Sequence, residues 1–184
     1  MGLRDRGERR REERENFGRD GAASRFQLRQ KLLSVGDDYW IEDEAGTRVF
    51  RVNGKALRLR DTLDVEDPSG TVLCRIQTRV LHVRDSMAIE DPDGDRLALV
   101  HQALISPLRE RWKVDRPTGP DWEVQGSIAD HEYEIEADGR KIGEVSKKWF
   151  RARDTYGVQV APGEDVLLLL AVTVAVDAMA HPHK

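Results

Sequence analysis

The chain has 184 residues, of which 39% are apolar and 35% are charged, and its formal net charge is −4. This length suits a single domain with a real core, and the composition does not suggest a membrane protein. The negative charge argues against a nucleic-acid partner, because such modules are usually basic. The one cysteine, Cys74, excludes an internal disulfide and a cysteine-based zinc cluster. With no secretory signal visible, we expect a cytoplasmic protein.

Residues 1–24 differ in kind from the rest of the chain. Seven arginines and six acids are mixed there with almost no aliphatic residues, so the segment carries +1 and leaves −5 for residues 25–184. Such a segment cannot bury enough apolar surface to offset the entropy cost of ordering. We therefore predict a disordered mixed-charge tail at 1–24, followed by one domain at 25–184. A basic arm for nucleic acid or membrane is disfavoured by the interspersed acids.

A loose internal repeat of about 24 residues begins after the tail, and it is clearest in its turns. Each unit contains a short Asp-, Pro- or Gly-rich turn of the kind that β-hairpins need, so each unit predicts two strands. The turns fall at 44–46, 67–70, 91–94, 116–119 and 137–139. Arg-Asp-Ser/Thr triplets at 60–62, 84–86 and 153–155 recur between units, and we interpret them as local Asx or ST turns.

Twelve strands follow from the turns and from the alternation of apolar with polar residues. We expect them at 26–32, 39–43, 47–53, 62–66, 71–77, 86–90, 95–101, 111–115, 121–126, 133–136, 140–146 and 155–160. In successive units, one position of the second strand is held by Val52, Ile76, Val100, Val124 and Val145. Two residues earlier, on the same face, stand Phe50, Cys74, Ala98, Trp122 and Gly143. Several of these are small, as an inner surface close to a bulky element would require.

The last predicted element is a helix at about 163–180, the one segment that is apolar on every side. Thr173 alone interrupts the run from Val166 to Val176. A helix without a polar face is enclosed by protein or lies in lipid, and this run is shorter than the roughly 20 residues that span a bilayer. We expect its core residues to be Val166, Leu167, Leu168, Leu169, Leu170, Val172, Val174 and Val176.

A closed antiparallel barrel of twelve strands around this helix accounts for both observations. Eleven strands already leave room for a central helix, so twelve can house one about 10 Å across. At about 1.5 Å per residue, the 18 residues would measure roughly 27 Å, close to the height of tilted strands of this length. The sequence therefore predicts a mainly β fold whose core is its C-terminal helix.

Four segments carry a resemblance to a known family: RFQLRQKLLSVGDDYWIEDEAG, RVFRVNGKALRLRDTL, VSKKWFRARDTYGV and VAVDAMAH. In this order they resemble the LURP-one-related family, whose domain shares the tubby C-terminal fold, over 25–181. The resemblance implies a twelve-stranded barrel around a hydrophobic C-terminal helix. It also brings a functional association: tubby domains bind phosphoinositides, related scramblases associate with phospholipid membranes, and plant members are linked to defence responses. It supplies no catalytic residues.

The strongest candidate for ligand binding is the basic run from Lys147 to Arg153, with sequence KKWFRAR. Four cations and one tryptophan lie in seven residues without an acid, a composition that suits an anionic lipid headgroup. If strand alternation continues through the run, Trp149, Arg151 and Arg153 project together. We expect the headgroup site to consist of Lys147, Lys148, Trp149, Arg151 and Arg153. A solvated strand end explains the same residues without a ligand.

The remaining candidates favour structural roles. The sequence DPDGD at 91–95 superficially resembles a calcium loop but lacks the helices and terminal glutamate of one, and it predicts a hairpin turn. His82, His101 and His131 are scattered, and His181-Pro182-His183 makes an incomplete metal site. Asp177 is expected at the helix exit, where it would meet solvent or an arginine. Cys74 is expected to be inert in the core.

Taken together, the residues predict a non-enzymatic tubby-like domain that binds anionic phospholipid headgroups at a membrane surface. We expect no catalytic residue, no metal and no cofactor, a monomer, no nucleic-acid partner, and a cytoplasmic or peripheral membrane location. The alternative is a protein-interaction or structural scaffold without a small-molecule ligand. Clustered basic residues on one wall favour lipid, whereas an exposed apolar patch of several hundred Å² would favour a protein partner.

Overall fold

The computed structural model describes Phe17 and residues 23–29, 38–54, 62–81, 84–103, 110–149 and 155–181. These residues form strands β1 (Ser24–Arg29), β2 (Tyr39–Asp43), β3 (Arg48–Asn53), β4 (Thr62–Glu66), β5 (Val72–Leu81), β6 (Arg84–Glu90), β7 (Arg96–Gln102), β8 (Glu110–Asp115), β9 (Trp122–Ser127), β10 (Glu132–Ala137), β11 (Arg140–Ser146) and β12 (Thr155–Val160). A 3₁₀ turn, η2 (Lys147–Trp149), follows β11, and the helix α3 (Val166–Ala180) follows β12.

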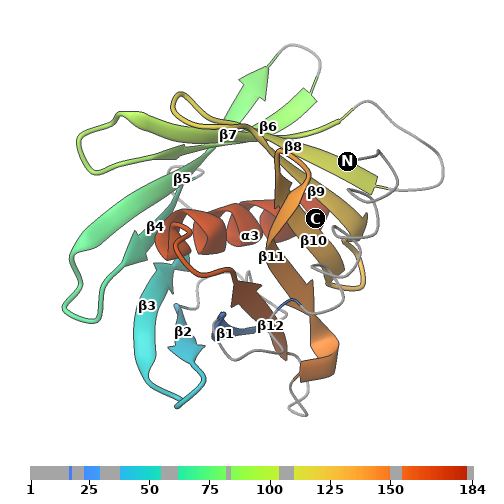
Figure 1. Cartoon of the computed structure of the whole chain (residues 1–184). Coiled ribbons are helices and arrows are strands. Elements are labelled where there is room, and N and C mark those ends of the chain that lie inside the picture. The colour runs from blue at the N-terminus through green and yellow to red at the C-terminus, as the bar shows by residue number, and fades with distance from the viewer. Residues whose placement is uncertain are drawn as a thin grey trace.

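The strands form a closed barrel in which each strand pairs antiparallel with its neighbours in sequence, and β1 closes the ring against β12. Figure 1 shows α3, in red, running through the interior of this barrel. The predicted closed twelve-stranded antiparallel barrel around a hydrophobic C-terminal helix is thereby confirmed. Four strands, β2, β4, β11 and β12, have the predicted ends, while β5 extends four residues further than expected, to Leu81. In the described part of the chain, no helix combines the length and apolar content needed to cross a bilayer.

The internal repeat appears in the structure as a repeated hairpin with a bulge. In four hairpins the register shifts at an apolar–glutamate step just before the turn, at Ile41/Glu42, Val65/Glu66, Ile89/Glu90 and Ile135/Glu136. A bulge adds one residue to one strand and increases the local twist. Bulges at corresponding positions therefore help to curve the sheet until it closes.

The hairpin turns are held by aspartate side chains. Asp43, Asp67 and Asp91 each accept hydrogen bonds from the backbone N–H groups two and four residues later, at 2.8–3.0 Å. In the turn that follows Asp67, Gly70 has a φ of 91°, which glycine adopts without strain. The 91–95 segment is thus the β6–β7 turn. The triplet at 84–86, by contrast, lies inside β6 and not in a turn, so our turn interpretation was wrong there.

The helix begins at Val166, three residues later than predicted, because the preceding residues form a turn and a cap. The Asp165 carboxylate accepts a hydrogen bond from the Leu168 N–H at 3.0 Å, which satisfies a free amide of the first turn. All residues from Leu168 to Ala178 are buried, and Thr173 satisfies its hydroxyl by donating to the Leu169 carbonyl. Val166 and Leu167 are half-buried at the entrance.

The inner wall of the barrel fits closely around this helix. Val52, Ile76, Val100, Val124 and Val145 are all buried, with exposures of 0–1%. Of the row two residues earlier, Phe50 is only half-buried and the others are buried. At Gly143 the fit is tightest, because an added Cβ atom would lie 2.9 Å from Leu169 Cδ1. The small residue of that row therefore makes room for the helix, as the pattern predicted.

Candidate functional site

The basic run begins at one end of the barrel wall, directly after β11. Lys147, Lys148 and Trp149 form η2, which packs against β12. The Lys148 side chain is 80% exposed, whereas Trp149 is half-buried. Residues 150–154 lie outside the described residues, and the predicted positions of Arg151 and Arg153 stay untested. The assumption that strand geometry continues through 147–149 was wrong, because a 3₁₀ turn has threefold and not twofold periodicity.

Glu132 at the start of β10 fixes the conformation of this turn. Its carboxylate accepts hydrogen bonds from Ser146 Oγ at 3.0 Å and from the Lys147 backbone N–H at 3.1 Å. The Ser146 hydroxyl oxygen in turn accepts a hydrogen bond from the Lys148 backbone N–H at 3.2 Å. Glu132 also pairs with the Lys148 ammonium at 3.3 Å, a contact weakened by exposure. The backbone of η2 is therefore anchored while the Lys148 side chain stays accessible.

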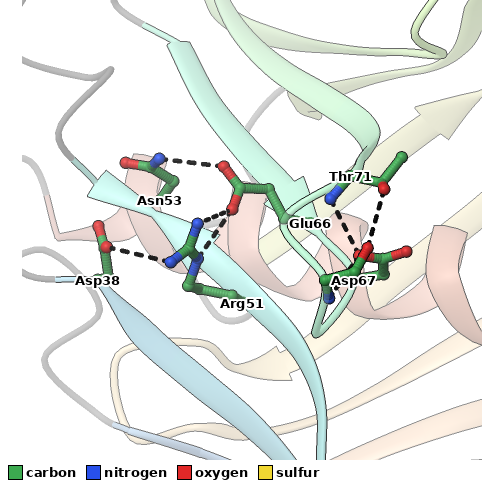
Figure 2. Close-up of polar contacts among 7 residues, drawn as sticks. Asp38, Arg51, Asn53, Glu66, Asp67 and Thr71 are labelled. Atoms are coloured by element: carbon green, nitrogen blue, oxygen red, sulfur yellow. Dashed lines mark hydrogen bonds and ion pairs between the residues drawn. The ribbon is translucent and has the colours of Figure 1, made fainter.

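Most arginines of the described barrel wall are paired with acids. Figure 2 shows Arg51 of β3 between Glu66 and Asp38, with Asn53 donating to the other oxygen of Glu66. The Glu66 side chain is only 6% exposed, and it raises the pKa of the Arg51 guanidinium by hydrogen bonding. This network is a structural ion pair, because both charged groups already have their partners. Further pairs are Arg25–Glu44, Arg48–Glu42, Arg75–Asp64, Arg79–Glu90 and Arg140–Glu164.

A second polar group lies inside the barrel, where α3 ends. Asp177 in the last turn of the helix is 4% exposed, and its carboxylate Oδ1 contacts His131 Nε2 at 2.5 Å and His181 Nδ1 at 3.3 Å. His131 is 1% exposed and precedes β10 with a φ of 53°, which is uncommon for a residue other than glycine. Its ring stacks on that of His181, with centroids 5.2 Å apart. We refer to these three residues as the His–Asp cluster.

Three buried tyrosines lie within reach of the charge of Asp177: Tyr39, Tyr133 and Tyr156. The ring of Tyr156 lies 4.4 Å from that of His131. Burial, and then the negative charge of Asp177, raise the pKa of all three phenols well above the usual value. The hydroxyls of Tyr39 and Tyr156, and Nδ1 of His131, have no hydrogen-bond partner among the described residues, whereas the Tyr133 hydroxyl lies near that of Thr173. Unpaired buried polar atoms are uncommon and call for a partner such as water or an ion.

Asp177 thus lies deeper than the sequence analysis expected. It is buried and meets His131 and the partly exposed His181, and no arginine of the described part of the chain pairs with it, so that expectation was wrong. One signal in the sequence points to the arrangement: a lone acid on an otherwise apolar helix must find a partner once it is enclosed. The sequence does not identify that partner, because His131 is 46 residues away and comes into contact with Asp177 only when the barrel closes around the helix.

The other candidates are apart from this cluster. His101 on β7 pairs with Asp115 on β8 at 3.1 Å, and both are on the outer surface. Cys74 is buried, and burial raises the pKa of its thiol to about 12, with a smaller effect of Asp165 and Asp64. His82 and His183 lie outside the described residues. The structure brings His131 and His181 together at Asp177, whereas His101 lies apart from them.

The fold and these sites define the class of the protein. A barrel of twelve antiparallel strands closed around an apolar helix is the tubby-like architecture. The family model described as LURP-one-related matches residues 24–177, and the chain belongs to this family. The resemblance seen in the four sequence segments is thereby confirmed.

Two known proteins extend the comparison. The X-ray structure of a protein from Arabidopsis thaliana superposes with a TM-score of 0.65, covering 86% of this chain and 92% of that chain at 18% identity. At that identity the likeness establishes the fold alone. An uncharacterised protein of Bacillus subtilis (strain 168), YxjI, is 34% identical over 65 residues, which are 35% of this chain and 40% of the Bacillus protein.

Proposed function

We propose that this chain is a non-enzymatic tubby-like domain that binds anionic phospholipid headgroups at the cytoplasmic face of a membrane through residues 147–153. The observation that carries the proposal is the anchored basic turn η2, in which Lys148 exposes 80% of its side chain beside Trp149. Tryptophan favours the interfacial region of a bilayer, and lysines there attract anionic headgroups. Arg151 and Arg153 extend the same acid-free run in the sequence.

The proposed binding is local, because the domain as a whole is acidic. Residues 25–184 carry a formal charge of −5, which repels an anionic surface at long range. Each basic residue near the surface contributes about 1 kcal/mol of attraction, so four of them support weak binding that falls as salt rises. The anchoring of η2 by Glu132 and Ser146 reduces the entropy lost when the turn contacts headgroups.

Vesicle flotation with the full chain tests this function. We expect the protein to float with vesicles that contain phosphoinositide, more at low than at physiological salt, and not with vesicles of neutral lipid. The triple variant Lys147→Glu, Lys148→Glu, Arg151→Glu removes about 3 kcal/mol of attraction, so its partition should fall roughly 100-fold.

A matched control reverses three cations elsewhere: Arg96→Glu, Arg111→Glu and Lys113→Glu on the exposed surface of β7 and β8. It changes the net charge by the same amount but leaves the basic run unchanged. It should therefore retain far more binding than the triple variant at 147–151. If the wild type never floats, or both variants float equally, the basic run is a solvated turn. The scaffold function then replaces the lipid function.

A further inference from the structure

We propose that His131, Asp177 and His181 bind one divalent transition-metal ion of the zinc class at the end of the central helix. One ligand atom from each residue lies within 4.8 Å of the others, so a single ion can contact all three after small adjustments. This inference is independent of the proposed lipid function. It concerns the barrel interior and not the basic turn.

The donor set selects the class of metal. Two imidazole nitrogens and one carboxylate oxygen suit Zn²⁺ and its neighbours in the transition series, whereas Ca²⁺ and Mg²⁺ require mainly oxygen ligands. Three protein ligands with a fourth position open to water is a common zinc arrangement.

The distances are compatible with this geometry. Zinc–nitrogen and zinc–oxygen bonds of about 2.0–2.1 Å place the ligand atoms of a tetrahedral site roughly 3.3 Å apart. The His181 Nδ1 to Asp177 Oδ1 distance is already 3.3 Å. The His131 Nε2 to Asp177 Oδ1 distance of 2.5 Å must open by about 0.8 Å. His181 follows the last residue of α3 and is 43% exposed, so it is free to adjust and marks the entry path for an ion.

The charge of the cluster favours an ion over a set of hydrogen bonds alone. Asp177 has a side chain that is only 5% exposed, and the basic groups within 4.0 Å of it, in the described part of the chain, are two imidazoles and no lysine or arginine. A buried carboxylate must be paired or must coordinate a metal. A divalent ion bound by Asp177 and the two imidazoles would supply that compensating charge.

The unpaired polar atoms around the cluster are an independent sign of a missing ligand. Tyr39 and Tyr156 have buried hydroxyls without partners among the described residues, and both phenols feel the charge of Asp177. A water molecule bound to the metal at its open position would offer hydrogen bonds to such hydroxyls, which would then hold it in place.

Cobalt substitution tests the site. The full chain, without a polyhistidine tag, is titrated with Co²⁺. The visible d–d absorption of the ion reports its binding in a tetrahedral site. We expect one Co²⁺ per chain and its displacement by one Zn²⁺. Zn²⁺ at about 100 times its dissociation constant should raise the melting temperature by roughly 5–10 °C.

Variants decide which residues bind the ion. His181→Ala leaves the barrel core intact and should weaken binding by more than about 10-fold, and Asp177→Asn should do the same. The matched control is His101→Ala, which removes a histidine that also contacts an aspartate, at 3.1 Å, on the outer surface. It should bind Co²⁺ as the wild type does.

Two outcomes would overturn the proposal. The first is an absence of bound Co²⁺, or equal affinity in the wild type and His181→Ala, with circular dichroism showing both folded. The second is a loss of affinity in His183→Ala as large as in His181→Ala, because the terminal His-Pro-His segment would then hold the ion without Asp177. Neither result bears on flotation, so the two functions are tested separately.

Discussion

The central part of α3 is surrounded by apolar side chains, whereas its C-terminal end at Asp177 is surrounded by polar ones. From Leu168 to Val176 the helix meets an apolar wall, and its one polar residue, Thr173, is satisfied within the helix. At Asp177 the surroundings change to two histidines and three tyrosines, several of whose polar atoms lack partners. In the first part, shape and apolarity suffice to seat the helix. The second part requires specific charge and hydrogen-bond partners, which an apolar residue does not replace.

The largest effect is expected from a charge in the apolar part. Leu169 is fully buried and packs against Gly143, so Leu169→Asp places an unpaired carboxylate where nothing can pair with it. The cost should be about 5 kcal/mol or more, comparable to the whole stability of a domain. We expect insoluble or unfolded protein by circular dichroism. Leu169→Met, which conserves volume, should cost less than about 1.5 kcal/mol, and a folded Leu169→Asp variant would contradict the architecture.

Alkaline pH should destabilise the apolar core through the buried thiol of Cys74 on β5. Burial raises the pKa of this thiol from 9.0 to about 12, so the unfolded chain loses the proton at a lower pH than the folded chain. The contribution of Cys74 to stability is complete below about pH 9 and is lost as pH rises toward 12, by up to about 4 kcal/mol. Urea unfolding at several pH values measures this slope. Cys74→Ala should have a shallower slope over the same interval, and equal slopes would contradict the prediction.

The reciprocal substitution, Asp177→Leu, tests the polar part. Although it makes the helix wholly apolar, it removes the partner of the buried His131 and should destabilise the metal-free protein by about 1–3 kcal/mol. The matched control is Asp115→Leu, which breaks an exposed His–Asp contact and should change stability by less than about 0.5 kcal/mol. A more stable Asp177→Leu protein would show that the two parts of the helix do not differ.

The smallest effect is expected outside the barrel. Phe17 lies over the Lys141 ammonium, 4.9 Å from the ring centroid, which joins the segment before β1 to the wall. Deleting residues 2–22 should therefore lower the unfolding free energy by at most about 1 kcal/mol, or roughly 2–4 °C in melting temperature. Phe17→Ala should reproduce the shift. A much larger loss on deletion would mean that further residues of the segment pack on the barrel.

The barrel could be predicted from the sequence because its signals are local. Turn residues such as Asp67 and Gly70 and the alternation within each strand depend on neighbours in the chain, and an apolar helix has few places to be buried. The site at the helix end was missed because it depends on packing between distant segments. Nothing near Asp177 in sequence indicates that His131 will face it. The 3₁₀ turn at 147–149 was missed for a related reason, since Glu132 from another strand holds its backbone.

The seam between β1 and β12 sets a condition on how the chain can fold. Ser24 of β1 pairs with Val160 of β12. One edge of β1 therefore has no hydrogen-bond partner until β12 has been synthesised, and α3 is synthesised after β12. Until then β1 presents unpaired backbone groups, and the inner walls lack the helix that fills them. Contacts this distant in sequence form slowly, and open strand edges invite association with other chains. During synthesis the growing chain is therefore an incomplete sheet with an exposed apolar face, and its protection against aggregation comes only when residues from Thr155 onward are made.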